Sequence, residues 1–238
     1  MTPYRSPGLT LAALATLGLL VAAHPAHANT NIVANSGFDA PNLGGGYFYK
    51  PTTISPWTFT GNSGVINPPS GFDSGGNPVY APSPDQYAFI QSAGGNQPGG
   101  EVSQTLNLTA GTTYNLSFLY AGRNGNGYPS YDGAADDLVS LNGDSGQGTV
   151  FSQNFSTKSN QDFTNFAGSF TTTATQAGDY TLKFTNISTS GDNTSFIDNV
   201  DVSAAPEPSQ LAGLAFTGFG ALGLILKTRK RKTSEVAD

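Results

Sequence analysis

The stretch 101–122, EVSQTLNLTAGTTYNLSFLYAG, contains two segments in which apolar and polar residues alternate. The apolar residues that share a face are Val102, Leu106 and Leu108 in the first segment, and Tyr114, Leu116, Phe118 and Tyr120 in the second. Successive side chains of a β-strand point to opposite faces, so a period of two indicates a strand with one buried face. The stretch therefore predicts two half-buried antiparallel strands joined by a turn at Gly111.

The same alternation continues along the chain. It places Val139 and Leu141 on one face of a strand. It does the same for Phe166 and Phe170, and for Tyr180, Leu182 and Phe184. The segment AGTTYNLSF from Ala110 is echoed by AGDYTLKF from Ala177, which indicates corresponding strands and does not require a duplication. No segment between residues 29 and 205 has a clear helical period. The sequence therefore predicts an all-β domain, an antiparallel sandwich of two sheets, over residues 29–204.

The amino terminus has the features of a secretory signal peptide. Arg5 is followed by an apolar run from Leu9 to Ala23 and then by Ala26-His27-Ala28, a small-x-small cleavage pattern. An uncleaved membrane helix is the alternative, but the run is short for one. We expect residues 1–28 to direct export through the Sec machinery and to be removed.

A second apolar segment, residues 211–226, lies near the carboxyl terminus and is followed by a basic cluster, Lys227 and residues 229–232. At about 1.5 Å per residue a helix here spans roughly 24 Å, slightly less than a hydrocarbon core of about 30 Å. Basic residues stay on the cytoplasmic side of a membrane. The segment thus predicts a single transmembrane helix with the preceding domain outside the cytoplasm.

Pro206, Glu207 and Pro208 stand immediately before this segment. Together with the apolar helix and the basic end, they make residues 205–232 resemble the PEP-CTERM sorting signal of exopolysaccharide-producing Gram-negative bacteria. The resemblance implies recognition by an exosortase, cleavage near the Pro-Glu-Pro motif and a transient stay in the inner membrane. It implies a final location at the cell surface or in the extracellular matrix of a biofilm. The alternative is a permanent single-pass anchor.

The composition of residues 29–205 excludes several kinds of chemistry. The chain has no cysteine, and its two histidines, His24 and His27, lie in the signal peptide. A Ser-His-Asp triad would therefore lack its base, and zinc or copper would lack their preferred ligands. Disulfides cannot stabilise the domain. Its stability must come from its hydrophobic core and, where oxygen ligands are available, from a hard cation such as calcium.

The predicted domain is strongly acidic. It holds Glu101 and a dozen aspartates, against Lys50, Arg123, Lys158 and Lys183. Such a surface repels nucleic acid and anionic membranes, so we expect no nucleic-acid partner. It suits a soluble exported protein, and solubility alone would account for most of the aspartates.

Four segments stand in the order seen in the galactose-binding-like jelly roll that many carbohydrate-binding modules use. They are NIVANSGFDAP from Asn31, PWTFTG from Pro56, the stretch from Gly99 to Gly122, and FIDNVDV from Phe196. The chain from 31 to 202 resembles that superfamily, which implies a jelly-roll sandwich. A shared fold does not imply sugar binding.

Asp198 occupies an apolar position of the last predicted strand. Strict alternation places it on one face with Phe196, Val200 and Val202. An unpaired carboxylate there is costly, so it should be protonated, hydrogen-bonded or bound to a cation. The resemblance implies a structural calcium ion where the first and last strands meet, with Asp39, Asp198 and Asp201 as candidate ligands. The alternative is a bulge that turns Asp198 outward.

Two aromatic clusters are candidate sugar sites, because sugars stack on aromatic rings and bind amides, carboxylates and arginine through their hydroxyls. The loop 122–137 supplies Arg123, Asn124, Asn126, Tyr128, Tyr131 and Asp132. The second cluster is Tyr47, Phe48 and Tyr49. Both could instead be ordinary loops, and Trp57 is expected in the core.

The sequence therefore favours a non-catalytic exported protein that binds a polysaccharide. A structural matrix or adhesin subunit without sugar binding is the main alternative. A glycoside hydrolase would need two carboxylates roughly 5 to 10 Å apart, for which Asp132, Asp136 and Asp137 are the candidates.

Overall fold

A computed structural model describes residues 30–68, 86–93, 98–124, 134–189 and 191–206. These residues belong to one compact unit. The predicted signal peptide and apolar segment 211–226, together with Glu207 and Pro208, lie outside the described residues, whereas Pro206 is described and exposed. No helix within the described ranges combines the length and the apolar character that crossing a membrane requires.

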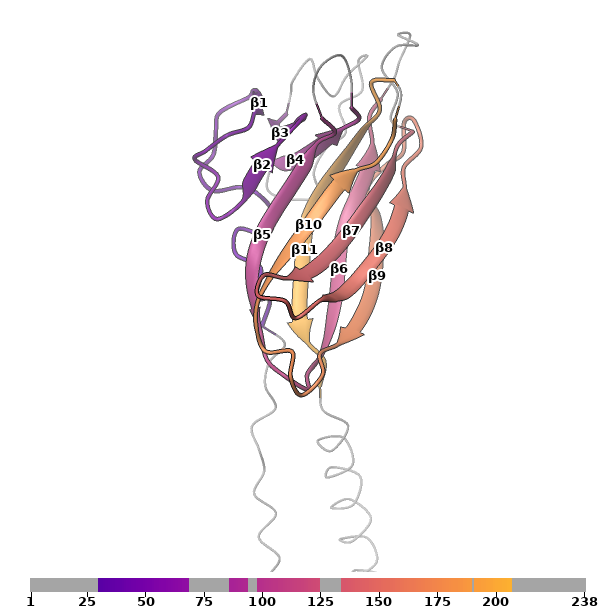
Figure 1. Cartoon of the computed structure of the whole chain (residues 1–238). Helices are drawn as coiled ribbons and strands as arrows, with labels where there is room; N and C mark the ends of the chain where they lie inside the picture. The colour runs from indigo at the N-terminus through magenta and orange to yellow at the C-terminus, as the bar shows by residue number, and fades with distance from the viewer. Residues whose placement is uncertain (1–29, 69–85, 94–97, 125–133, 190, 207–238) are drawn as a thin grey trace, which may run out of the picture. The chain divides into compact units, whose positions relative to one another are not determined.

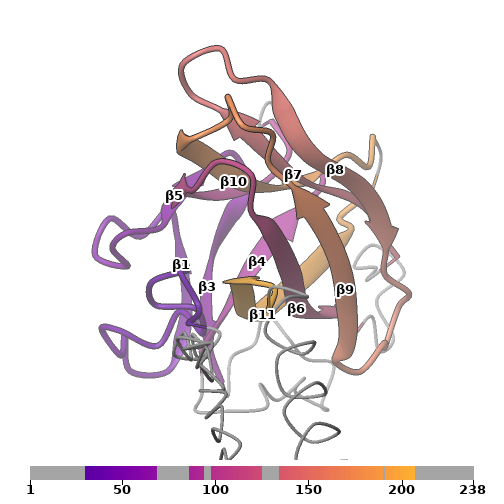
Figure 2. The same ribbon diagram turned by 90° about the horizontal axis from the view of Figure 1, so that it is seen from below.

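The described residues form two antiparallel sheets that face each other (Figure 1). The first sheet has six strands, in the spatial order β1 (Gly46–Tyr49), β3 (Ser63–Asn67), β4 (Tyr87–Gln91), β11 (Thr194–Ala204), β6 (Thr113–Gly122) and β9 (Thr164–Thr171). The second has five, in the order β2 (Thr58–Thr60), β5 (Glu101–Leu108), β10 (Gly178–Asn186), β7 (Asp136–Gly143) and β8 (Thr149–Ser156). The view in Figure 2 separates them into two layers.

The order of the strands from β4 to β11 is that of a jelly roll. In the six-stranded sheet β4, β11, β6 and β9 are neighbours, and in the other sheet β5, β10, β7 and β8 are neighbours. The chain thus crosses repeatedly between the sheets, as in two interlocked Greek keys. The all-β sandwich predicted from the alternation is confirmed.

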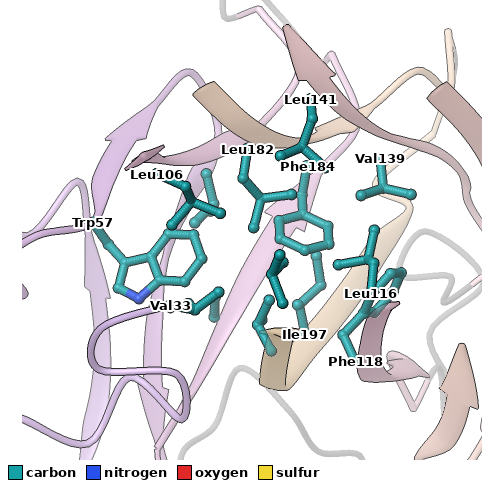
Figure 3. Packing of buried hydrophobic residues seen from close by; sticks show 14 of the residues in the cluster. Val33, Trp57, Leu106, Leu116, Phe118, Val139, Leu141, Leu182, Phe184 and Ile197 are labelled. Atoms are coloured by element: carbon teal, nitrogen blue, oxygen red, sulfur yellow. The ribbon is translucent and has the colours of Figure 1, made fainter. Parts of the chain in front are cut away.

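Alternate residues of both sheets fill the space between them, as Figure 3 shows. Leu116 and Phe118 of β6 face Val139, Leu141, Leu182 and Phe184 of the other sheet, and all six are at most 1% exposed. The rings of Phe118 and Phe184 meet edge to face at 5.0 Å, so the two echoed segments lie in opposite sheets and pack on each other. Trp57 is 4% exposed and belongs to this core, as expected.

The last strand departs from strict alternation. Asp198 does not share the core face with Val200 and Val202, and the bulge considered as the alternative is present. The pairing of β11 with β6 shifts register between Asp198 and Asp201, and Asn199 there has a φ of 48°. This irregularity is a β-bulge, which inserts a residue and reverses the faces beyond it. Ile197, Val200 and Val202 therefore point into the core, while Phe196 joins a separate apolar cluster on the outer face. By alternation Asp198 lies on that outer face with Phe196.

Candidate functional site: the outer face of the six-stranded sheet

The outer face of the six-stranded sheet, which points away from the second sheet, carries a row of aromatic rings. Strand pairing aligns Tyr49 with Gly64, Gly64 with Phe89, and Phe89 with Phe196. The rings of Tyr49 and Phe89 meet edge to face at 5.0 Å, and those of Tyr47 and Tyr49 do so at 6.0 Å. Because ring quadrupoles favour this geometry, the contacts hold β1 and its side chains against the sheet.

Gly64 makes the contact between Tyr49 and Phe89 possible. A Cβ at this position would lie 2.0 Å from the carbonyl oxygen of Phe48 and 2.7 Å from a ring carbon of Phe89. Glycine inside a strand often marks such a close approach of another group. The Tyr49 ring therefore reaches Phe89 across a position that has no side chain.

The accessible part of the row is at β1. Phe89 and Phe196 are fully buried, whereas Tyr47 is 49% exposed and Tyr49 is 45% exposed. Phe48 lies between the two tyrosines but pairs with Val65, a core residue, and so points to the opposite face. Tyr47 and Tyr49 thus present two neighbouring rings to solvent from one strand.

A line of polar contacts connects Tyr49 to the centre of the sheet. The Tyr49 hydroxyl donates to Oε1 of Gln91 at 3.0 Å, and Nε2 of Gln91 donates to Oδ1 of Asp192. The other oxygen of Asp192 pairs with Arg123 at 3.2 Å. Burial and the charge of Asp192 raise the pKa of Tyr49, with Arg123 opposing, so the hydroxyl stays protonated and fixed as a donor.

The structure joins the two predicted clusters in part. Tyr49 of one cluster and Arg123 of the other are the two ends of this polar line. Arg123 is 7% exposed and Asn124 is 9% exposed, so neither is the open sugar contact that the sequence predicted. The other predicted residues of the loop, Asn126, Tyr128, Tyr131 and Asp132, lie outside the described residues.

Sequence reasoning missed Gln91 and Asp192. Gln91 ends β4 and Asp192 precedes β11, about a hundred residues later in the chain. Only strand pairing, which aligns Gln91 with Thr194, brings them together. No motif in the sequence marks either residue.

The structure brings the carboxylates of Asp39 and Asp198 close to each other. An ideal Cβ on Gly37 would lie 2.6 Å from Oδ2 of Asp39 and 3.5 Å from Oδ1 of Asp198. Asp198 is fully buried; its Oδ1 accepts from the amide of Asn199, and no partner is found for its Oδ2 within the described part of the chain. Burial, opposed by the Asn199 amide and reinforced by the charge of Asp39, raises the pKa of Asp198 to about 7.

Asp201 lies beyond the bulge and accepts a hydrogen bond from Ser203 at 2.8 Å. Among the described residues no group of three or more acidic, histidine or cysteine side chains is suited to hold a metal ion. The predicted set of three carboxylate ligands is therefore reduced to Asp39 and Asp198.

Asp136 and Asp137, two of the carboxylates considered for glycoside hydrolysis, do not share a cleft. They are consecutive residues of β7 and point to opposite faces, with Asp136 exposed and Asp137 fully buried between the sheets. The third, Asp132, lies outside the described residues.

No protein-family model and no curated protein matches the chain. Among solved structures it is similar to a Stig cyclase from Fischerella sp. TAU, with 20% identity and a TM-score of 0.57 over 75% of this chain and 99% of that one. TmCBM61, solved with β-1,4-galactotriose, has 17% identity and a TM-score of 0.48 over 75% of this chain and 99% of its own. A CBM4 module has 18% identity and a TM-score of 0.47, over 73% of this chain and 99% of the module. The likeness to the cyclase shows a shared fold alone, because one fold carries many different activities.

Proposed function

We propose that the chain is an exported, non-catalytic protein that binds polysaccharide through the outer face of its six-stranded sheet. The observation that carries the proposal is the pair of half-exposed rings, Tyr47 and Tyr49, the second of which is held in place by the line of hydrogen bonds through Gln91 and Asp192. Aromatic faces cover the apolar side of a sugar ring, and polar groups at their edge bind its hydroxyls.

The charge of the domain favours an uncharged ligand. Asp192, the carboxylate in the polar line that begins at Tyr49, is already paired with Arg123, and Lys183 is paired with Glu101. The rest of the domain is acidic. A polyanionic glycan would therefore be repelled, while a neutral one would lose little to electrostatics.

A glycan array tests this function. We expect the β-sandwich fragment, residues 29–204, to bind neutral polysaccharides, and the double variant Tyr47→Ala/Tyr49→Ala to lose that binding. Phe48→Ala is the matched control, because Phe48 lies on the same strand with a comparable exposure of 37% and points the other way. If the wild type binds no glycan, the chain is a structural matrix or adhesin subunit instead. Tyr128→Ala and Tyr131→Ala test the other predicted cluster in the same format.

The proposed location rests on the two terminal segments of the sequence. An amino-terminal signal peptide and a PEP-CTERM-like tail together support export, exosortase processing and retention at the cell surface or in the matrix. We expect mass spectrometry of the protein from native cells to find a carboxyl-terminal peptide that ends near Glu207. A native protein that extends through Asp238 would show a permanent anchor.

We further propose that a calcium ion bridges Asp39 and Asp198. Two adjacent carboxylates with a buried oxygen that lacks a partner fit a hard cation, which prefers oxygen ligands. These residues would hold the ion between the segment before β1 and the last strand, and the ion would neutralise the negative charge of the two carboxylates.

Calcium removal should then lower the stability of the fragment. We expect a chelator to reduce the unfolding temperature of the wild type, because an ion bound to the folded state stabilises it by mass action. Asp198→Ala should remove this sensitivity, whereas Asp162→Ala, at an exposed position, should keep it. An unfolding temperature of the wild type that is the same with calcium and with chelator would refute the site.

A further inference from the structure

Asp137 is a buried carboxyl group at one end of the space between the sheets. It is fully buried and lies on the inward face of β7, the face that Val139 and Leu141 continue into the core. Neither the proposed glycan face nor the proposed calcium site uses it. Its position and chemistry therefore need their own explanation.

The contacts of Asp137 connect the two sheets. The hydroxyl of Ser195, on β11 of the six-stranded sheet, lies 2.5 Å from Oδ2 of Asp137. Ser195 also lies 3.0 Å from the hydroxyl of Thr157, which accepts from the amide of Ala135 at 3.2 Å. For Oδ1 of Asp137, no hydrogen-bond partner is found within the described residues. A carboxylate would leave this buried oxygen charged and unsolvated.

The described strands around Asp137 bring it no positive charge. β8 has no ionisable side chain, and the cation of β10, Lys183, is paired with Glu101. Arg123 is paired with Asp192, and Lys158 is exposed. On β11, Asp198 points to the outer face. The charge that does act on Asp137 is that of Asp136, which has the same sign.

A neutral carboxyl group at Asp137 avoids the free-energy cost of burying a charge without a cation beside it. Burial, opposed by the Ser195 hydrogen bond and reinforced by Asp136, raises the pKa of Asp137 to about 7. In the unfolded chain an aspartate has a pKa of about 3.9. Because the folded value is the higher one, the stability that the group contributes is complete below about 4 and is lost as the pH rises through about 7.

We propose that Asp137, hydrogen-bonded to Ser195 of the opposite sheet, is a pH-sensitive junction between the two sheets. The junction is stable while the carboxyl group is neutral, and it is destabilised when ionisation leaves a charged and poorly solvated oxygen between the sheets. The contact lies next to Thr194, whose carbonyl oxygen accepts from the amide of Arg123 at 3.1 Å. It thus acts at the end of the sandwich where β7, β11 and the residue that follows β6 meet. The proposal does not depend on glycan binding.

Unfolding of the full chain in urea, in a mild non-ionic detergent, tests the contact. Trp57 is the one tryptophan of the chain and is buried, so its fluorescence reports unfolding. The ratio of folded to unfolded molecules is measured for the wild type and for Asp137→Asn at each pH. As the pH rises from about 4 to 7, the ratio of the wild type should fall, relative to that of the variant, by up to about tenfold for each pH unit. At pH 8.5 the Asn variant should be more stable than the wild type. Asp162→Asn, at an exposed position, should behave as the wild type does.

The same pH dependence in the wild type and in Asp137→Asn would overturn the proposal. If the Asn variant does not fold, Ser195→Ala provides the test, because it removes the hydroxyl and leaves the carboxyl group. The proposal then expects a lower urea midpoint than that of the wild type at pH 5. Equal midpoints at pH 5 would show that the hydrogen bond does not hold the sheets together.

Discussion

Replacing Phe118 by alanine is expected to lower the free energy of unfolding by about 3–5 kcal/mol. Phe118 is 1% exposed and its ring contacts Phe155, Phe166 and Phe184, with the stacked Phe166 ring at 4.5 Å. These partners come from β8, β9 and β10, and thus from both sheets. Truncation removes the apolar area and leaves a cavity that four strands would have to move to fill.

Urea unfolding of the fragment 29–204, followed by Trp57 fluorescence, measures this loss. A loss of that size should also lower the unfolding temperature by roughly 10 °C. Ile187→Ala is the control, since Ile187 is 40% exposed and its truncation should cost little. A loss below about 1 kcal/mol for Phe118→Ala would show that the two sheets do not pack on each other at this residue.

Tyr49→Ala is expected to weaken binding of the strongest glycan on the array by about 30-fold, the loss typical of a residue that dominates an interface. The substitution removes an exposed ring, the hydroxyl that contacts Gln91 and the edge contact with Phe89. Isothermal titration calorimetry of the fragment measures the change directly.

Tyr49→Phe separates the ring from the hydroxyl. It keeps the stacking surface and deletes the hydrogen bond to Gln91, so we expect a loss of about fivefold, near 1 kcal/mol. Phe48→Ala should leave affinity unchanged within about twofold. If Tyr49→Ala binds as tightly as the wild type, the ligand does not contact β1.

Most of the fold could be predicted because alternation is a local signal. Residues such as Leu116, Phe118, Leu182 and Phe184 reveal their buried face through spacing alone, and each points into the core as expected. The resemblance to jelly-roll modules implied the topology, and the strand order agrees with it. Burial therefore follows from a short window of sequence wherever a strand is regular.

The departures occur where the strands are irregular or where contacts are distant in sequence. The bulge after Asp198 depends on a positive φ at Asn199, which no pattern in FIDNVDV specifies. Arg123 looked accessible because it stands among glycines and asparagines, but its charge is neutralised by Asp192, some seventy residues later. Pairing between distant strands decides such contacts, and a single sequence does not show that pairing.

Some features of the candidate site follow from local alternation, and others depend on pairing between distant strands. Tyr47 and Tyr49 were identified as an aromatic cluster, and alternation separates them from Phe48. Their value as a binding surface depends on Gly64, Phe89 and Gln91, which strand pairing supplies. The resemblance implied that Asp39 and Asp198 lie close together. The inward position of Asp137 follows from the alternation along β7, which places it on the same face as Val139 and Leu141.

Mapping the glycan contact by NMR tests the central claim most directly. Titration of the isotope-labelled fragment with the strongest glycan from the array should shift the amide signals of Tyr47, Tyr49, Gln91 and Arg123. The amides of β8, in the other sheet, should stay unchanged. Shifts confined to the five-stranded sheet, or no shifts at saturating concentrations of neutral glycans, would contradict the account that the outer face of the six-stranded sheet binds polysaccharide.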